Sequence, residues 1–275
     1  MNLRRRYLRD RLMVGLVYLG TLVVLLPLLL ILGYVFVKGA GALNWDFFTK
    51  PPAPPGEGGG GMLPAIVGTF IIDLMALAMG GLLGLGGGVL MAEYPEHPLG
   101  RPLRMVANVL GGIPAILMGL FAFVVVVVPM GGFSAFSGSV ALAILMIPII
   151  MRSTEEVLKL LPWELREAGL ALGLPRWRVT LSLILPAAKG GIVTGLLLAL
   201  ARAAGEAAPL LFTAFGNQFL SFDPLGPMDS LPLKIYVYAI SPYEDWIQQA
   251  WGAALLLALM LMATNFLARR AMRRR

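Results

Sequence analysis

"EAGLALGLPRWRVTLSLILP", residues 167–186, is a basic, partly apolar stretch that lies between two long apolar segments. Pro162 suits the first turn of a helix and Gly173 suits its end, so a short helix is expected between them. Three residues recur at helical spacing along it: Leu165, Ala168 and Leu172. Pro175 is expected to start a second helix, which Pro186 stops. The stretch therefore predicts two short amphipathic helices joined by a glycine elbow.

Two uses fit this helix pair. Tryptophan and arginine favour a membrane surface, and the pair contains Trp163, Trp177, Arg176 and Arg178. The small residues of "EAGLALG", residues 167–173, instead leave room for another protein. A membrane-surface element and a docking element for a cytoplasmic partner are both compatible with these residues.

Apolar segments of membrane-spanning length surround this stretch. The chain of 275 residues is 58% hydrophobic and 13% charged, with a mean hydropathy of +0.82, which indicates an integral membrane protein. Six segments stand out, at residues 14–37, 63–91, 106–130, 136–151, 192–215 and 246–267. Most reach the ~20 residues that a helical span needs. The first is too long for a signal-peptide core and is expected to be retained. The prediction is an all-α protein with six transmembrane helices.

Lysine and arginine orient these spans. If both termini are cytoplasmic, 18 of the 22 basic residues lie inside, in the two tails and in the two inner connections. This distribution predicts an N-in, C-in topology. The net charge of +7 then follows from membrane topology, so we expect lipid contacts and no nucleic-acid partner.

Several kinds of catalytic site are excluded by composition. The chain has no Cys and a single His, His97, so it offers neither thiol chemistry nor a cluster of histidine metal ligands. The glycines of "TKPPAPPGEGGGG", residues 49–61, do not form a P-loop, because no lysine in the chain follows a glycine. We therefore expect a non-enzymatic chain without a cofactor or metal, and an external connection at residues 49–61.

Glycine is frequent in the second and third spans. It occurs in "GGLLGLGGG", residues 80–88, and in "GGIPA", residues 111–115, where Pro114 is able to kink a helix. Small residues allow helices to pack closely in lipid, and close packing is the simpler interpretation. The alternative is that these helices line or hinge a transport pathway.

The stretch at residues 167–186 resembles the EAA loop of ABC-importer permeases, which has Glu-Ala-Ala, three residues, Gly, nine residues and Ile-x-Leu-Pro. The matching residues are Glu167, Ala168, Gly173, Leu185 and Pro186. Gly169 replaces the second Ala, and Leu183 replaces the Ile. The resemblance implies that residues 167–173 sit in a cleft of an ATPase and convert its closure into movement of the spans.

Two further stretches resemble phosphate permeases of the PstA type. They are "LARAAGEAAPLLFTAFGN", residues 200–217, and "PMDSLPLKIYVYAISPYEDWIQQAW", residues 227–251. The resemblance implies a type I ABC importer with MetI-like architecture in a bacterial or archaeal cytoplasmic membrane. It also implies three kinds of partner: a homologous second permease, two copies of a P-loop ATPase, and a periplasmic or extracellular phosphate-binding protein.

This resemblance divides the chain into three parts. Residues 1–62 hold the basic tail, the first span and the external loop. Residues 63–268 form the permease core, with the coupling loop at 152–189. Residues 269–275 form a basic cytoplasmic tail.

Arg202 and Glu206 are charged residues within the predicted fifth span. An arginine near the centre of a bilayer costs ~2.5–3.5 kcal/mol on insertion scales. At a spacing of four residues the two side chains share a helix face, so a structural ion pair is one interpretation. The other gives Arg202 a role in binding the transported anion and Glu206 a role in gating or expelling it. Asp73, in the second span, is expected to have a packing role.

Three alternatives to a phosphate importer remain at this level. One is a permease for sulfate, molybdate or another oxyanion. Another is an ion-coupled secondary carrier in which Asp73 or Glu206 binds the coupling proton, although such a carrier needs no ATPase-docking helix. A membrane scaffold without transport fits poorly with the charges at Arg202 and Glu206.

Overall fold

Long apolar helices form the body of the protein, because a helix satisfies its own backbone in hydrocarbon. The computed structural model describes residues 3–273, so the extreme ends of both basic tails lie outside it. In that range five helices are long and apolar enough to span a membrane, and a bent pair gives a sixth candidate. The unbroken spans are α1 (Leu3–Ala40), α3 (Leu63–Glu93), α7 (Ala135–Lys159), α10 (Leu185–Ala203) with the short helical turns before it, and α13 (Glu244–Arg273). The predicted all-α membrane fold is confirmed.

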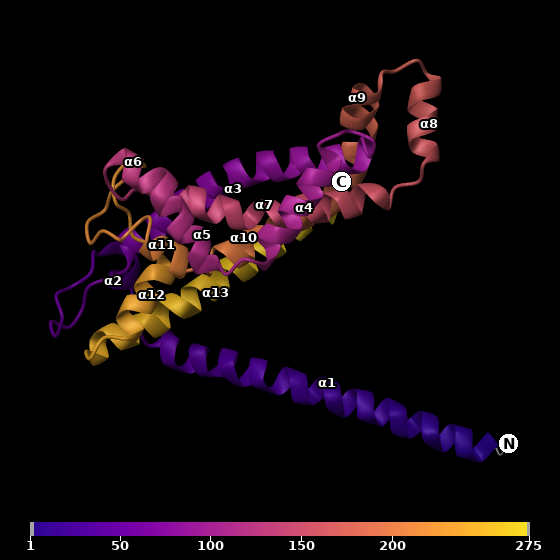
Figure 1. Cartoon of the computed structure of the whole chain (residues 1–275). Helices are drawn as coiled ribbons and strands as arrows, with labels where there is room; N and C mark the ends of the chain where they lie inside the picture. Colours follow the sequence, from indigo (N-terminus) through magenta and orange to yellow (C-terminus); the bar gives the residue numbers. More distant parts are fainter. Residues whose placement is uncertain (1–2, 274–275) are drawn as a thin grey trace.

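Helix α1 extends away from the other helices and meets them only near its C-terminal end (Figure 1). There Tyr34 packs edge-on against Trp251 of α13, with ring centroids 5.1 Å apart. The described part of the basic tail belongs to this same helix. Most of the apolar surface of α1 is therefore left for lipid or for another protein.

The glycine run of the second span packs against the fourth span. Helices α3 and α7 run parallel, and a Cβ built on Gly80, Gly84 or Gly88 would lie within 3.1 Å of an α7 atom. These glycines are four residues apart, so they form one stripe on the face of α3. Close packing, the simpler interpretation of residues 80–88, is therefore confirmed.

The third predicted span is broken rather than continuous. It consists of α4 (Gly100–Gly112), α5 (Ala115–Ala122), the π-helical turn η1 (Phe123–Val127) and α6 (Val128–Met130). The two halves are bent by 110°. Ile113 is extended, at φ −78° and ψ 133°, as expected for a residue before proline. Pro114 therefore ends the first half instead of merely kinking it.

The fifth span also differs from the prediction at both ends. Helix α9 (Arg176–Val179), the π-helical turn η2 (Thr180–Ile184) and α10 form one helix, so Pro186 does not stop it. The π turn ends at Ile184, two residues before Pro186. Its wider hydrogen-bonding pattern lets the helix continue past the proline, which has no N–H to donate. The helix ends at Ala203 rather than near residue 215, because Gly205 and Pro209 follow.

The two ends of the bundle carry different elements (Figure 1). One end presents α8 (Glu164–Ala171) and α9, which are predicted to be cytoplasmic. The other end presents α2 (Trp45–Thr49), α11 (Ala208–Leu211) and α12 (Leu231–Ala239) together with their loops. Residues 152–159 of the predicted coupling loop continue α7 as a helix, so the irregular connection before α8 is short.

Candidate functional site

Arg202 lies in the last turn of α10, about halfway along the bundle. Helix α10 runs antiparallel to α7, and a Cβ built on Gly195 would clash with Oγ of Ser153. Two turns further on, Ala203 packs in the central cluster with Met146, near the midpoint of α7. The fifth span therefore ends beside the middle of α7, and the cationic side chain of Arg202 lies at that point.

Arg202 and Glu206 are not paired as the sequence suggested. The helix ends at Ala203, so Glu206 does not lie on the same helix face as Arg202. Among residues 3–273, no ion pair or side-chain hydrogen bond involves either group, and Arg202 is exposed while Glu206 is half-buried. A cation at a helix C-terminus is favoured by the helix dipole, which offsets part of the cost of Arg202.

A second helix break lies beside this one. Helix α5 packs on α11, where a Cβ built on Gly119 would lie 2.5 Å from Cα of Pro209. Ile113, at the break in the third span, packs against the same central cluster that contains Ala203. In membrane proteins, non-helical backbone at this depth is tolerated where it is buried in protein or lines a cavity. The two breaks thus gather irregular backbone around the level of Arg202.

Helix α8 presents a partly apolar face to solvent. Glu167 and Ala168 are exposed, and Leu172 is 79% exposed. Gly173 follows with φ +78°, and its N–H donates to the carbonyl of Leu170, while Leu174 N–H donates to Gly169. This is a Schellman ending, which glycine favours because it adopts positive φ without strain. The predicted helix and its glycine elbow are confirmed.

The opposite face of α8 packs on η2. A Cβ built on Gly169 would lie 2.8 Å from Cδ1 of Leu183 and 2.9 Å from Val179. Gly169 and Leu183 are the two departures from the EAA pattern, and the structure brings them into contact. The smaller residue at 169 leaves room for the leucine. Of the other matching residues, Leu185 is partly buried beneath this face, whereas Pro186 is exposed in the first turn of α10.

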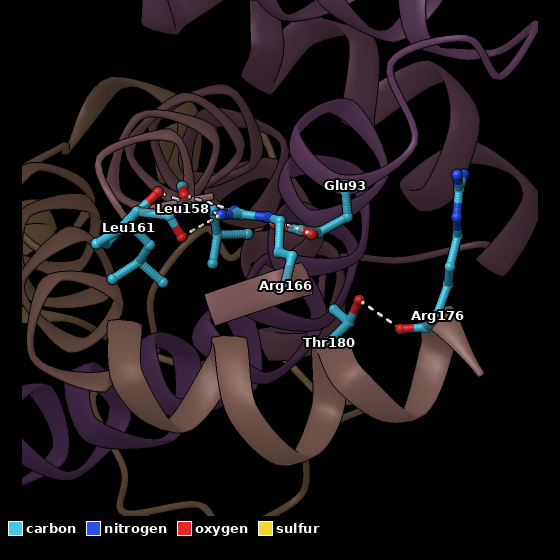
Figure 2. A network of polar contacts seen from close by, with 7 residues as sticks. Glu93, Leu158, Leu161, Arg166, Arg176 and Thr180 are labelled. Carbon is cyan, nitrogen blue, oxygen red and sulfur yellow. Dashed lines mark hydrogen bonds and ion pairs between the residues drawn. The ribbon is translucent and has the colours of Figure 1, made fainter. Parts of the chain in front are cut away.

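Arg166 is the residue of this region that the sequence did not single out. Its guanidinium donates to both carboxylate oxygens of Glu93, at 2.6 and 3.0 Å, and to the carbonyls of Leu158 and Leu161, at 2.8 and 3.2 Å (Figure 2). The side chains of Arg166 and Glu93 are 8% and 7% exposed. Arg166 precedes Gly169 by three residues, so helical spacing places it on the buried face. Its partner, 73 positions earlier, has no sequence signal.

A second buried pair lies at the other end of the bundle. The Lys234 ammonium is 2.8 Å from a carboxylate oxygen of Asp229, and the two side chains are 9% and 2% exposed. Burial raises the pKa of the Asp229 carboxyl, and the Lys234 charge offsets part of that rise. Lys234 also lies over the ring of Tyr238, at 5.0 Å. In the predicted topology Lys234 is one of the four basic residues that do not lie inside.

Comparison with known proteins assigns the family. Residues 84–274 match the model of the binding-protein-dependent transport system inner membrane component. A phosphate transport system permease protein PstA from Pasteurella multocida is 40% identical over 265 residues, which cover 96% of this chain and 94% of the relative. The PstA of Yersinia pestis is 42% identical and covers 88% of this chain and 82% of the relative. A probable PstA of Methanocaldococcus jannaschii is 38% identical, with 94% and 92% covered.

Solved structures show the same fold at lower identity. An inward-facing MetNI methionine ABC transporter is 22% identical, with a TM-score of 0.64, and covers 77% of this chain and 96% of its own. An amino acid ABC transporter is 14% identical, with a TM-score of 0.56. Helix packing, sequence and family model agree, and the chain belongs to the family of binding-protein-dependent transport system inner membrane components, as a relative of the PstA permeases.

Proposed function

We propose that this chain is the permease subunit of an ATP-driven phosphate importer and forms half of the translocation pathway. The observation that carries the proposal is Arg202, an exposed guanidinium at mid-depth with no polar partner among the described residues. A guanidinium donates in a planar fork that suits phosphate oxygens, and it stays charged at all relevant pH values. The names of the curated relatives support phosphate as the anion.

Weak binding is as important as recognition, because a transport site must release its ion. Glu206 follows Arg202 after the helix ends, and its negative charge reduces the attraction of the site for an anion. In this proposal Arg202 attracts phosphate from the outer side and Glu206 keeps the binding weak enough for release. The pathway is completed by a homologous second permease, because one exposed face of a broken helix does not enclose an ion.

The remaining partners follow from the family and from α8. Two copies of a separate P-loop ATPase would supply ATP hydrolysis. The exposed face of α8, around Glu167, Ala168 and Leu172, would sit in a cleft of one of them. A phosphate-binding protein would deliver the anion from the periplasmic or extracellular side. The setting is a bacterial or archaeal cytoplasmic membrane, with the chain as a multi-pass component and both tails inside.

Uptake by reconstituted vesicles tests this proposal. Vesicles would hold this chain, its partner permease, the ATPase and the binding protein, and labelled phosphate would be offered with sulfate or molybdate as competitors. We expect ATP-dependent phosphate uptake that the competitors do not suppress. ATP-dependent sulfate uptake without phosphate uptake would overturn the substrate, and uptake driven by a proton gradient without ATP would indicate a secondary carrier.

A further inference from the structure

Helix α8 makes more contacts with the fifth span than with the second and fourth spans. Its backbone packs mainly on α9 and η2, the start of the fifth span. A cavity of about 390 Å³ lies next to it, lined by Glu93, Trp163, Arg166 and the turn at residues 94–97. The connection of α8 to the second and fourth spans therefore depends on few contacts, and the Arg166 side chain makes the strongest of them.

Arg166 reaches the ends of both of those spans. Glu93 is the last residue of α3, and Leu158 belongs to the last turn of α7. Arg166 donates to the carbonyl of Leu158, in the last turn of α7, and to that of Leu161, just after the helix ends. Helices α3 and α7 are already locked together by the glycine stripe. A displacement of Arg166 would therefore act on a rigid pair of spans.

The contact between Arg166 and Glu93 is strong enough to transmit displacement. It is bidentate, which fixes the relative orientation of the two groups as well as their distance. Both side chains are almost fully buried, and separating a buried pair leaves an uncompensated charge. The ring of Trp163 lies 5.4 Å from the guanidinium carbon and covers it.

We propose that Arg166 and Glu93 form a permanent tie that makes α3 and α7 follow the movement of α8. Arg166 is a positioning residue in this proposal, because it touches neither the transported ion nor the nucleotide. The proposal rests on the proposed function, since it assumes that an ATPase displaces α8. Without the tie, α8 still moves the fifth span through α9 and η2, and the second and fourth spans follow only through the packing of α10 on α7.

Neutral variants of the two residues test the tie in the complete reconstituted complex. Glu93→Gln and Arg166→Gln are expected to lower anion uptake per ATP hydrolysed by about 5- to 150-fold, the usual range of allosteric coupling. The Gln variants should lose stability because each leaves a buried charge unpaired, so the ratio is measured on the complex that still assembles and hydrolyses ATP. Arg166→Lys keeps the charge without the bidentate contact, is the variant least prone to misfold, and should lose less. An unchanged ratio of uptake to hydrolysis in Glu93→Gln and Arg166→Lys would overturn the proposal.

Two neighbouring residues provide matched controls. Glu96 and Arg176 line the same cavity, are exposed, and make no ion pair among the described residues. Figure 2 shows the Arg176 side chain pointing away from Arg166. Glu96→Gln and Arg176→Gln should keep the wild-type ratio of uptake to hydrolysis. If these controls lost as much uptake per ATP, any change of charge in the cavity would have the same effect, and the proposed tie would be overturned.

A chemical cross-link distinguishes a tie from a switch. The chain has no cysteine, so Glu93→Cys/Arg166→Cys introduces the only two thiols of this chain. Bridging them with a flexible bifunctional thiol reagent should restore uptake per ATP that the unbridged double variant has lost. A bridge that abolishes the remaining uptake would show that the pair must open during the cycle, which contradicts the proposal. Failure of the wild-type complex to transport phosphate would instead refute the proposed function.

Discussion

The two arginines of this protein that matter most differ in every physical respect. Arg166, near the end of the bundle that carries α8, is buried, bidentately paired with Glu93 and bonded to two carbonyls at and just after the end of α7. Arg202, at mid-depth, is exposed and has no partner within residues 3–273. A buried charge that is paired within the fold contributes to stability. An exposed charge without a partner is able to bind a ligand. The contrast separates a cation that the fold neutralises from one that we propose meets the transported anion.

The largest expected effect is a difference in stability between the two sites. Arg166→Leu leaves the Glu93 carboxylate buried without its partner, which should cost about 3–5 kcal/mol of folding free energy. Arg202→Leu removes an unpaired charge and should not lower stability. Thermal unfolding of the purified complexes in detergent measures both. The comparison fails if Arg202→Leu proves as destabilising as Arg166→Leu.

Phosphate uptake is the measurement in which a change at Arg202 should show. Arg202→Gln removes charge-assisted hydrogen bonds to the anion, each contributing about 1.5–3 kcal/mol, so phosphate uptake should fall by at least about tenfold. Arg202→Lys keeps the charge but not the fork and should retain part of the uptake. Membrane abundance serves as the control for insertion. Full phosphate uptake by Arg202→Gln would rule out contact with the anion.

The close packing of Gly169 against the start of the fifth span should also affect stability. Gly169→Ala places a methyl group against Leu183 and Val179, and such overpacking costs about 1–3 kcal/mol. Combining it with Leu183→Val removes the nearest clashing atom and should recover part of the loss. A double-mutant cycle on thermal unfolding measures the coupling between the two positions. Strict additivity would show that Gly169 and Leu183 do not compensate one another.

The smallest expected effect is at Glu206. It has no partner among residues 3–273, so Glu206→Gln should leave stability unchanged. Removing its repulsion should tighten anion binding by up to ~1 kcal/mol, the scale of partly screened charge pairs, and slow release. The Michaelis constant and maximal rate of uptake report the two changes separately. Glu206 would lose its gating role if neither constant changed.

Local patterns predicted those parts of the structure that depend on neighbours in the chain. The apolar spans, the short helix before Gly173 and the glycine contacts of the second span follow from period, caps and side-chain size. The predictions of a continuous third span and of the two ends of the fifth span were wrong, because hydropathy measures composition and not helix continuity. Both segments are apolar along most of their length. Pro114 nevertheless interrupts the helix in residues 106–130, and Gly205 and Pro209 end it in residues 192–215.

The candidate site shows the same division. The exposed face of α8 could be predicted because spacing along a helix fixes which residues share a face. The pair between Arg202 and Glu206 could not be judged, since it depended on whether the helix continues past Ala203. The contact between Arg166 and Glu93 joins residues 73 positions apart, and two isolated charges carry no local signal of their partnership.

The sequence by itself determined that this is a multi-span membrane protein with a short docking helix, because hydrophobic length and helix-ending residues act locally. Tertiary structure alone decided which charges are neutralised. Arg166 is enclosed where the ends of α3 and α7 meet α8, and burial there forces it to find a carboxylate and free carbonyls. Arg202 lies at the end of α10, where no carboxylate of the described residues pairs with it, so its charge is not neutralised within the chain.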